Sequence, residues 1–82
     1  MAWTVYILKC ADNSLYTGIT TDIDRRVDEH NNCNKKGARY TRARRPVSLV
    51  YQEGCTDRAH ASKREHALKK LPRTEKLNLT SA

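Results

Sequence analysis

The chain has 82 residues, 38% of them hydrophobic, and a formal net charge of +7. This length predicts one small domain over residues 1–82, and the apolar content excludes a disordered tail. No apolar run approaches the length of a transmembrane helix, and residues 1–4 lack the basic and apolar segments of a signal peptide. We therefore expect a cytoplasmic protein without membrane contact.

Cysteine usage gives no sign of a metal site or a disulfide framework. Cys10, Cys33 and Cys55 are odd in number, and none belongs to a CxxC motif. Reduced thiols are the expectation for such a pattern.

The positive charge lies in the second part of the chain. Residues 1–34 hold three basic and five acidic side chains, a net of −2, whereas residues 35–82 hold thirteen and four, a net of +9. Six cations without an intervening anion form a basic segment: Lys35, Lys36, Arg39, Arg42, Arg44 and Arg45. A phosphate backbone is the partner that such a segment favours, because each neutralised phosphate releases counterions. A solvated loop that serves solubility is the alternative, and an anionic membrane surface is a weaker one.

The first elements predicted are a β-hairpin and a helix. Residues 3–8 and 15–19 have strand composition and flank turn residues at 11–14. An odd number of loop residues would put Tyr6, Tyr16 and Gly18 on one face, whereas a two-residue turn would separate the tyrosines.

The helix is predicted from a cap within residues 20–22 to about Asn31. Ile23 and Val27 mark its apolar stripe, with His30 close to it and Arg26 at its edge. Arg25, Asp28 and Glu29 are expected to face water.

The rest of the chain predicts a loop over residues 32–46, a third strand over 47–51 and two helices. The first of these helices begins after Thr56 or Asp57 and ends near Leu71, and the second runs from Pro72 to Leu79. Within the first, Glu65 shares a face with Ala61 and Leu68. A carboxylate on a buried face needs a cation or a metal to stay ionised.

These side chains could together supply metal-dependent hydrolysis. That chemistry needs a carboxylate for the ion, a group that takes a proton from water, and cations for transition-state charge. Tyr6, Tyr16, Arg26, His30 and Glu65 offer those parts. Ordinary packing of the tyrosines and a salt-bridged Glu65 are the alternative.

A family resemblance strengthens the catalytic interpretation. Val5-Tyr6-Ile7 and Tyr16-Thr17-Gly18 resemble the paired tripeptides of the GIY-YIG nuclease superfamily, and residues 19–31 are similar to its following helix. Further segments resemble its small stand-alone bacterial members, which are similar to the nuclease domain of Slx-type endonucleases: residues 37–41, 44–47, 62–65 and 69–72. The resemblance covers nearly the whole chain.

The resemblance implies an α/β (α+β) fold, a small three-stranded antiparallel sheet flanked by helices, that cleaves phosphodiesters with one divalent ion. It implies Glu65 as the ligand of Mg²⁺, or of Mn²⁺. Tyr6 would be the general base or its water-orienting partner, and Tyr16 would position the phosphate or the water. Arg26 would stabilise charge on the phosphate, and His30 would join a proton relay or contact the phosphate.

Two further residues and one constraint follow. Tyr40 would be a supporting phosphate contact, and the missing side chain of Gly18 would let a phosphate approach. A free tyrosine has a pKa of about 10, so Tyr6 as a base needs a lowered pKa or help from the metal ion.

The substrate expected is DNA rather than RNA, with cleavage directed by nicks, flaps or branches in repair or recombination. Larger relatives attach a specificity domain that this sequence lacks, so sequence-specific cleavage is not expected. Two alternatives stay open: a non-catalytic nucleic-acid-binding module, or a nuclease subunit that needs a protein partner for specificity.

Overall fold

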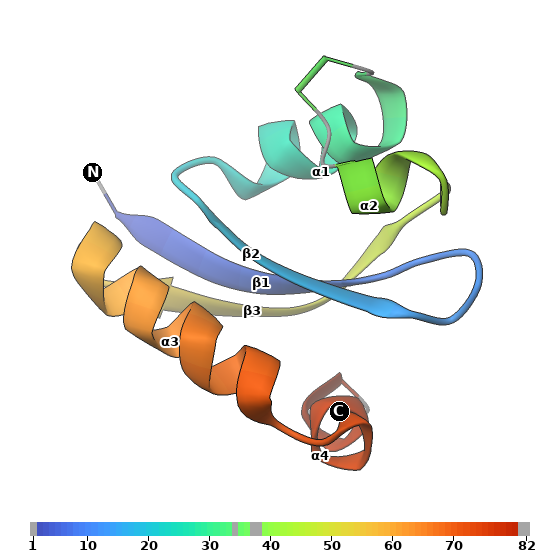
Figure 1. Cartoon of the computed structure of the whole chain (residues 1–82). Helices are drawn as coiled ribbons and strands as arrows, with labels where there is room; N and C mark the ends of the chain where they lie inside the picture. The colour runs from blue at the N-terminus through green and yellow to red at the C-terminus, as the bar shows by residue number, and fades with distance from the viewer. Residues whose placement is uncertain (1, 34, 37–38, 81–82) are drawn as a thin grey trace.

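The computed structural model describes residues 2–33, 35–36 and 39–80. Its elements in chain order are β1 (Trp3–Lys9), β2 (Leu15–Thr20), α1 (Ile23–Asn32), α2 (Arg39–Arg42), β3 (Ser48–Cys55), α3 (Arg58–Lys70) and α4 (Arg73–Thr80). Figure 1 shows an antiparallel sheet in the order β2-β1-β3, with α1 and α2 on one face and α3 and α4 on the other. This confirms the predicted three-stranded antiparallel α+β fold.

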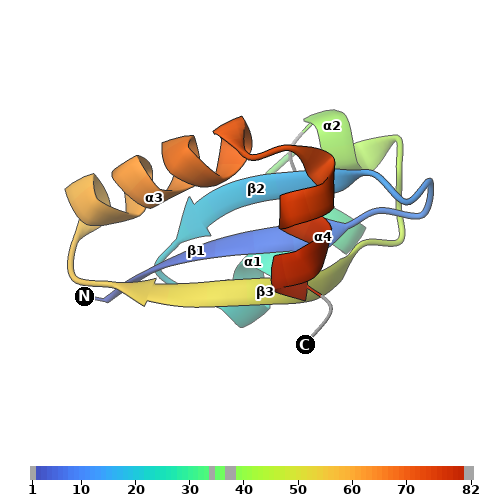
Figure 2. The same cartoon turned by 90° about the horizontal axis from the view of Figure 1, so that it is seen from below.

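Side chains of β1 point alternately to the two faces of the sheet, and each face has its own hydrophobic core. Val5 packs with Ala61 and Leu68 of α3, whereas Tyr6 and Leu8 lie in the layer that contacts α1. Figure 2, seen from the α3 and α4 side, shows that β1 runs through the middle of the sheet, which explains why its central residues are buried.

The hairpin has the register that brings the two tyrosines together. Tyr6 pairs with Gly18 and Leu8 with Tyr16, and residues 10–14, an odd number, connect the strands. Asn13 occupies the left-handed region with φ 68°, which asparagine tolerates better than most residues. Of the two hairpin alternatives, the one-face arrangement is therefore correct.

Two side-chain caps fix where the long helices begin. Asp22 Oδ1 accepts a hydrogen bond from the Arg25 backbone N–H (3.1 Å), and Asp57 Oδ1 accepts one from the His60 N–H (2.8 Å). Each bond satisfies a backbone donor that has no partner within its helix. The helix that carries Arg26 and the helix that carries Glu65 are thereby both anchored at the N-terminal end.

Two sequence-based expectations were wrong in part. The predicted loop over 32–46 contains the short helix α2, which local propensity does not reveal because α2 packs against α1, an element outside its local sequence. The third strand continues past Tyr51 to Cys55, because pairing with β1 holds polar residues such as Gln52 and Glu53 in the sheet.

Among the described residues, no helix is long and apolar enough to cross a membrane. All three cysteines carry free thiols, two of them in the core.

Candidate active site

The ring of Tyr6 lies directly over Gly18 of the edge strand β2. A Cβ atom at Gly18 would stand 2.5 Å from Tyr6 Oη and 2.7 Å from its Cζ, closer than real carbon contacts allow. Gly18 is therefore required by the tyrosine ring. The expectation that its missing side chain makes room for a phosphate was wrong, because Tyr6 already fills that space.

Tyr6 begins a chain of three buried polar side chains. Its hydroxyl lies 2.9 Å from His30 Nε2, and His30 Nδ1 lies 2.8 Å from Thr41 Oγ1. Tyr6 is only 1% exposed, and His30 and Thr41 are fully buried. Both nitrogens of the imidazole are thus satisfied, one by β1 and one by α2. Sequence reasoning missed Thr41, because its partner is on another helix and its own segment was predicted to be a loop.

Burial shifts the pKa values of the Tyr6–His30 pair in opposite directions. Loss of hydration raises the pKa of Tyr6 to about 12, although interaction with Arg26 opposes this rise. Loss of hydration, followed by the charge of Arg26, lowers the pKa of His30 to about 4. At neutral pH both groups are therefore uncharged. A free-standing phenolate at Tyr6, which would need a lowered pKa, is opposed by this environment.

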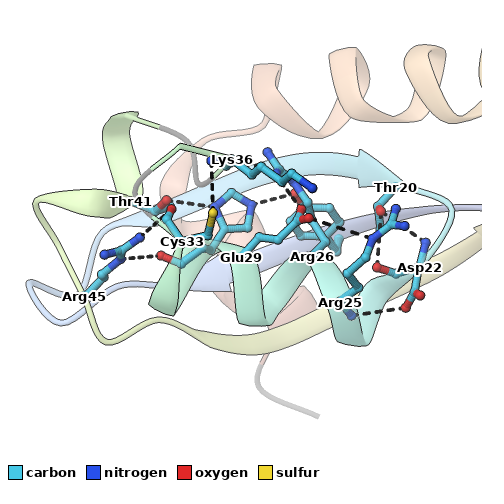
Figure 3. Close-up of polar contacts among 11 residues, drawn as sticks. Thr20, Asp22, Arg25, Arg26, Glu29, Cys33, Lys36, Thr41 and Arg45 are labelled. Carbon is cyan, nitrogen blue, oxygen red and sulfur yellow. Dashed lines mark hydrogen bonds and ion pairs between the residues drawn. The ribbon is translucent and has the colours of Figure 1, made fainter.

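Arg26 lies at the edge of the site on α1. Its Nη1 donates to Glu29 Oε1 (3.1 Å) and to the Lys36 carbonyl (2.6 Å), as Figure 3 shows. Its side chain is 24% exposed, so part of the guanidinium reaches solvent. Glu29, expected to face water, is instead only 15% exposed, because its carboxylate is paired with Arg26. Apolar periodicity alone could not place an ion pair on this side of the helix.

Glu65 lies in the other layer of the fold, and its charge acts on Tyr6. It lies on α3, which packs against β1 and β2, and its side chain is 25% exposed. Its Oε2 atom is 3.4 Å from Lys69 Nζ. Its negative charge helps to raise the pKa of Tyr6, although burial and the neighbouring Tyr16 have larger effects. The half-buried position predicted for this carboxylate is confirmed.

Two more tyrosines form the exposed border of the site. The Tyr16 ring contacts His30 edge to face, with centroids 5.2 Å apart, and stacks on Tyr40 with centroids 5.9 Å apart and planes at 25°. The Arg44 guanidinium lies 4.0 Å from the Tyr40 ring centroid. Tyr16 therefore joins the buried Tyr6–His30 pair to the aromatic surface at α2.

The basic segment divides into two groups. Lys35, Lys36, Arg39 and Arg42 are exposed. Arg44 pairs with Asp12 of the hairpin turn, with Nε to Oδ2 at 3.1 Å. Arg45 donates from Nε to the His30 carbonyl (2.6 Å) and from Nη2 to the Cys33 carbonyl (3.0 Å), so it closes the end of α1. The last two arginines, expected to bind nucleic acid, thus also have structural partners.

The described residues contain no group of three or more histidine, cysteine or acidic side chains that could enclose a metal ion. A site with one carboxylate still fits Mg²⁺, which commonly keeps several waters and takes one or two protein carboxylates. The Glu65 carboxylate, 25% exposed and paired with Lys69, meets that requirement.

Comparison with known proteins identifies the family. The GIY-YIG catalytic domain matches residues 2–78. The chain belongs to the GIY-YIG family, a family of nucleases that act on nucleic acids. Within it, the chain is similar to UPF0213 proteins. It is 63% identical to UPF0213 protein DP2720 of Desulfotalea psychrophila over 99% of this chain and 73% of the relative. It is 53% identical to UPF0213 protein SERP0126 of Staphylococcus epidermidis, over 92% and 89%.

Two solution NMR structures have the same fold. UPF0213 protein BH0048 of Bacillus halodurans is 44% identical, with a TM-score of 0.61 over 99% of this chain and 84% of that one. Protein EF2693 of E. faecalis is 41% identical, with a TM-score of 0.62 over 93% and 79%. None of these four names states an activity, so the chemistry of this chain rests on its family and its own site.

Proposed function

We propose that this protein is a divalent-metal-dependent endonuclease that hydrolyses phosphodiester bonds in DNA, directed by strand structure and acting in repair or recombination. The observation that carries the proposal is the buried Tyr6–His30 pair, which Tyr16 contacts and whose pKa values the Arg26 charge affects. The Glu65 carboxylate of α3 adds a negative charge that also acts on Tyr6. A protein that only binds nucleic acid needs no such half-buried carboxylate beside a tyrosine–histidine pair.

The neutral Tyr6–His30 pair supports a proton relay. When His30 Nδ1 carries the ring proton and donates a hydrogen bond to Thr41 Oγ1, Nε2 can accept a hydrogen bond from the Tyr6 hydroxyl. As water attacks the phosphorus, its proton passes to the Tyr6 oxygen while the Tyr6 proton passes to His30 Nε2. The imidazolium that forms is opposed by the lowered pKa of His30, and the negative charge that develops on the phosphate offsets this cost. Tyr6 then never has to exist as a separate phenolate, which agrees with its raised pKa.

Charge on the phosphate is met by the exposed part of Arg26. The guanidinium already donates to the Lys36 carbonyl, so a phosphate oxygen would replace a neutral acceptor with a charged one. Such an exchange strengthens the interaction when charge develops in the transition state. Tyr16, half-buried between His30 and Tyr40, would orient the phosphate or the water, and its ring contacts with both residues support this role.

Glu65 would hold the divalent ion, Mg²⁺ or Mn²⁺. When bound, such an ion supplies Lewis-acid stabilisation of the phosphate and activation of water. The Lys69 ammonium lies 3.4 Å from the carboxylate and is the partner that the ion would replace.

The experiment is cleavage of end-labelled linear, nicked, flapped and branched DNA in Mg²⁺ or Mn²⁺. EDTA and Glu65→Gln should each abolish cutting. Glu75→Gln is the matched control, because Glu75 is an exposed glutamate on the neighbouring helix α4. We expect wild-type activity from it, and cuts concentrated at the strand discontinuity.

The negative results also discriminate. Equal cutting by Glu65→Gln would overturn the assignment of the carboxylate. No cutting of any substrate, with DNA binding intact, would favour a binding module or a subunit that needs a partner. Repeating the assay after co-purification with candidate partners separates those two.

A further inference from the structure

The Tyr40 ring forms part of a stack that faces solvent. The Tyr40 ring stacks on the Tyr16 ring of β2, and the Arg44 guanidinium lies 4.0 Å from the centroid of Tyr40. Tyr40 is 39% exposed, and among the described residues only Leu77 is a comparably exposed large hydrophobic side chain. The three side chains come from β2, α2 and the turn after α2, so the fold assembles this surface from separate elements.

The stack is held rigidly. Arg44 Nη1 donates to the Tyr40 carbonyl (2.9 Å) and Nε to Asp12 Oδ2 (3.1 Å). The Arg44 main chain is fixed too, since its N–H donates to the Thr41 carbonyl (3.0 Å) and its carbonyl accepts from the Ala11 N–H (2.9 Å). Binding a flat ligand here would therefore order few additional side chains, which lowers its entropic cost.

The chemistry of the stack fits a nucleobase better than a phosphate. Asp12 offsets the charge of Arg44, and hydrogen bonds occupy two of its nitrogen atoms. Tyr16 and Arg44 already lie against the Tyr40 ring, so what remains available is the guanidinium plane of Arg44 and the exposed part of the Tyr40 ring. Bases of any sequence stack on such flat surface. The exposed cations around it suit the backbone of the same strand: Lys35, Lys36, Arg39 and Arg42.

We propose that Tyr40 and Arg44 form a stacking platform for an unpaired base next to the phosphate that is cut. The ligand is a single-stranded or locally unpaired nucleic acid, because a base inside a duplex is already stacked on both sides and cannot reach the platform. Tyr16 connects the platform to His30, so the stacked nucleotide lies beside the proposed relay. This inference deepens the proposed function and rests on it for the cleavage step, but not for binding.

The test is binding in EDTA, where no cleavage occurs, measured by fluorescence anisotropy. Short single-stranded oligonucleotides are compared with oligonucleotides of the same length whose central residues are abasic. The two probes have equal numbers of phosphates and differ only in bases. Stacking on one base predicts about tenfold weaker binding of the abasic probe. DNA and RNA versions of both probes distinguish which backbone accompanies the base.

Two variants separate stacking from general damage. Tyr40→Leu should bind the intact and the abasic probe alike, at the affinity that the wild type has for the abasic one. Tyr40→Phe keeps a ring and should restore the difference. A 2-aminopurine placed among the central bases should be quenched by the wild type and by Tyr40→Phe, but not by Tyr40→Leu. Circular dichroism and urea unfolding verify that both variants are folded.

The outcomes distinguish this inference from the proposed function. Equal wild-type affinity for intact and abasic probes, or no binding of either, would overturn the platform even if DNA is cleaved. Base-dependent binding that disappears in Tyr40→Leu would support the platform even if no metal ion produces cleavage, in which case only the nuclease proposal fails.

Discussion

At the scale of single residues, the buried hydrogen-bond chain from Tyr6 through His30 to Thr41 governs the chemistry available to the site. Each link is at hydrogen-bond distance and is shielded from water. Because buried polar groups lose hydration, removal of one member leaves its partner unsatisfied, at a cost of about 1–3 kcal/mol. The chain can therefore be tested through stability as well as through activity.

Thr41→Val removes the oxygen that faces His30 Nδ1 and keeps the side-chain shape. We expect a loss of about 1–2 kcal/mol in the free energy of unfolding, and slower cleavage if the relay is correct. Thr41→Ser retains the hydroxyl, so His30 should keep the tautomer that it has in the wild type. ¹⁵N NMR of the imidazole measures the tautomer in each variant. An unchanged tautomer in Thr41→Val would contradict the role assigned to Thr41.

The lowered pKa of His30 predicts a pH-dependent stability. An unfolded histidine titrates near 6.5, whereas folded His30 titrates at about 4, so the unfolded state binds more protons between these values. Stability should therefore be unaffected by His30 above pH 7 and fall as the pH drops through this window. The fall amounts to about 2 kcal/mol by pH 5.

Urea unfolding at pH 8 and pH 5 measures this effect. His30→Gln should lose that share of the pH dependence, although it starts from a lower stability. His66→Gln is the matched control on the exposed side of α3 and should retain it. Equal pH dependence in wild type and His30→Gln would show that the imidazole is not buried as a neutral group.

At the scale of elements, the contact between β1 and β2 explains why a glycine stands opposite Tyr6. Gly18 pairs with Tyr6 and leaves room for its ring, while Gly54 of β3 pairs with Thr4 on the other side of β1. A Cβ at Gly54 would meet nothing within 4 Å. Both glycines therefore pair with β1, but a side chain would fit at Gly54 and would clash at Gly18.

Gly18→Ala should force the Tyr6 ring away from its place, destabilising the fold by about 1–3 kcal/mol and disrupting the contact with His30. Gly54→Ala should stay within about 1 kcal/mol of the wild type, since the added methyl group has space. Thermal or urea unfolding of both variants provides the comparison. Equal destabilisation would mean that strand propensity, rather than the ring, decides the effect.

The same scale shows what could be predicted from the sequence. Strand composition and turn residues predicted the hairpin, and helical spacing placed His30 and Glu65 on inward faces, because these patterns depend on neighbours within one element. Thr41, by contrast, is defined by His30 of another helix, and Glu29 by its pairing with Arg26. Asp12 meets Arg44 only after the chain has folded back. The sequence pattern within one element cannot predict such partners.

At the scale of the whole molecule, charge is distributed to favour a polyanion. The net charge of residues 35–82 is +9 against −2 for residues 1–34. Figure 1 shows α2 toward one end of the sheet and the start of α3 at the other end. At that second end, Arg58 of α3 lies 5.9 Å from the centroid of the Trp3 ring. Binding of nucleic acid should thus be local to one end and strongly dependent on salt.

Lys35→Gln should weaken binding of all DNA sequences alike and reduce the slope of log K against log[salt] by about 0.7–0.9, as expected for one lost phosphate contact. Arg58→Gln, at the distant start of α3, is the matched control and should leave the slope unchanged. Titrations at several salt concentrations give both slopes. Equal slopes for wild type and Lys35→Gln would place the phosphate path elsewhere.

The position of β1 between β2 and β3 also orders events during biosynthesis. On the ribosome, β1 can pair with β2 as soon as the hairpin emerges, but its other edge waits for Ser48–Cys55, and Glu65 follows only with α3. A nascent chain thus gains its tyrosines, Arg26 and His30 before the carboxylate proposed to hold the metal ion. The carboxylate therefore joins the other candidate residues only late in synthesis, once β3 has completed the sheet and α3 has emerged.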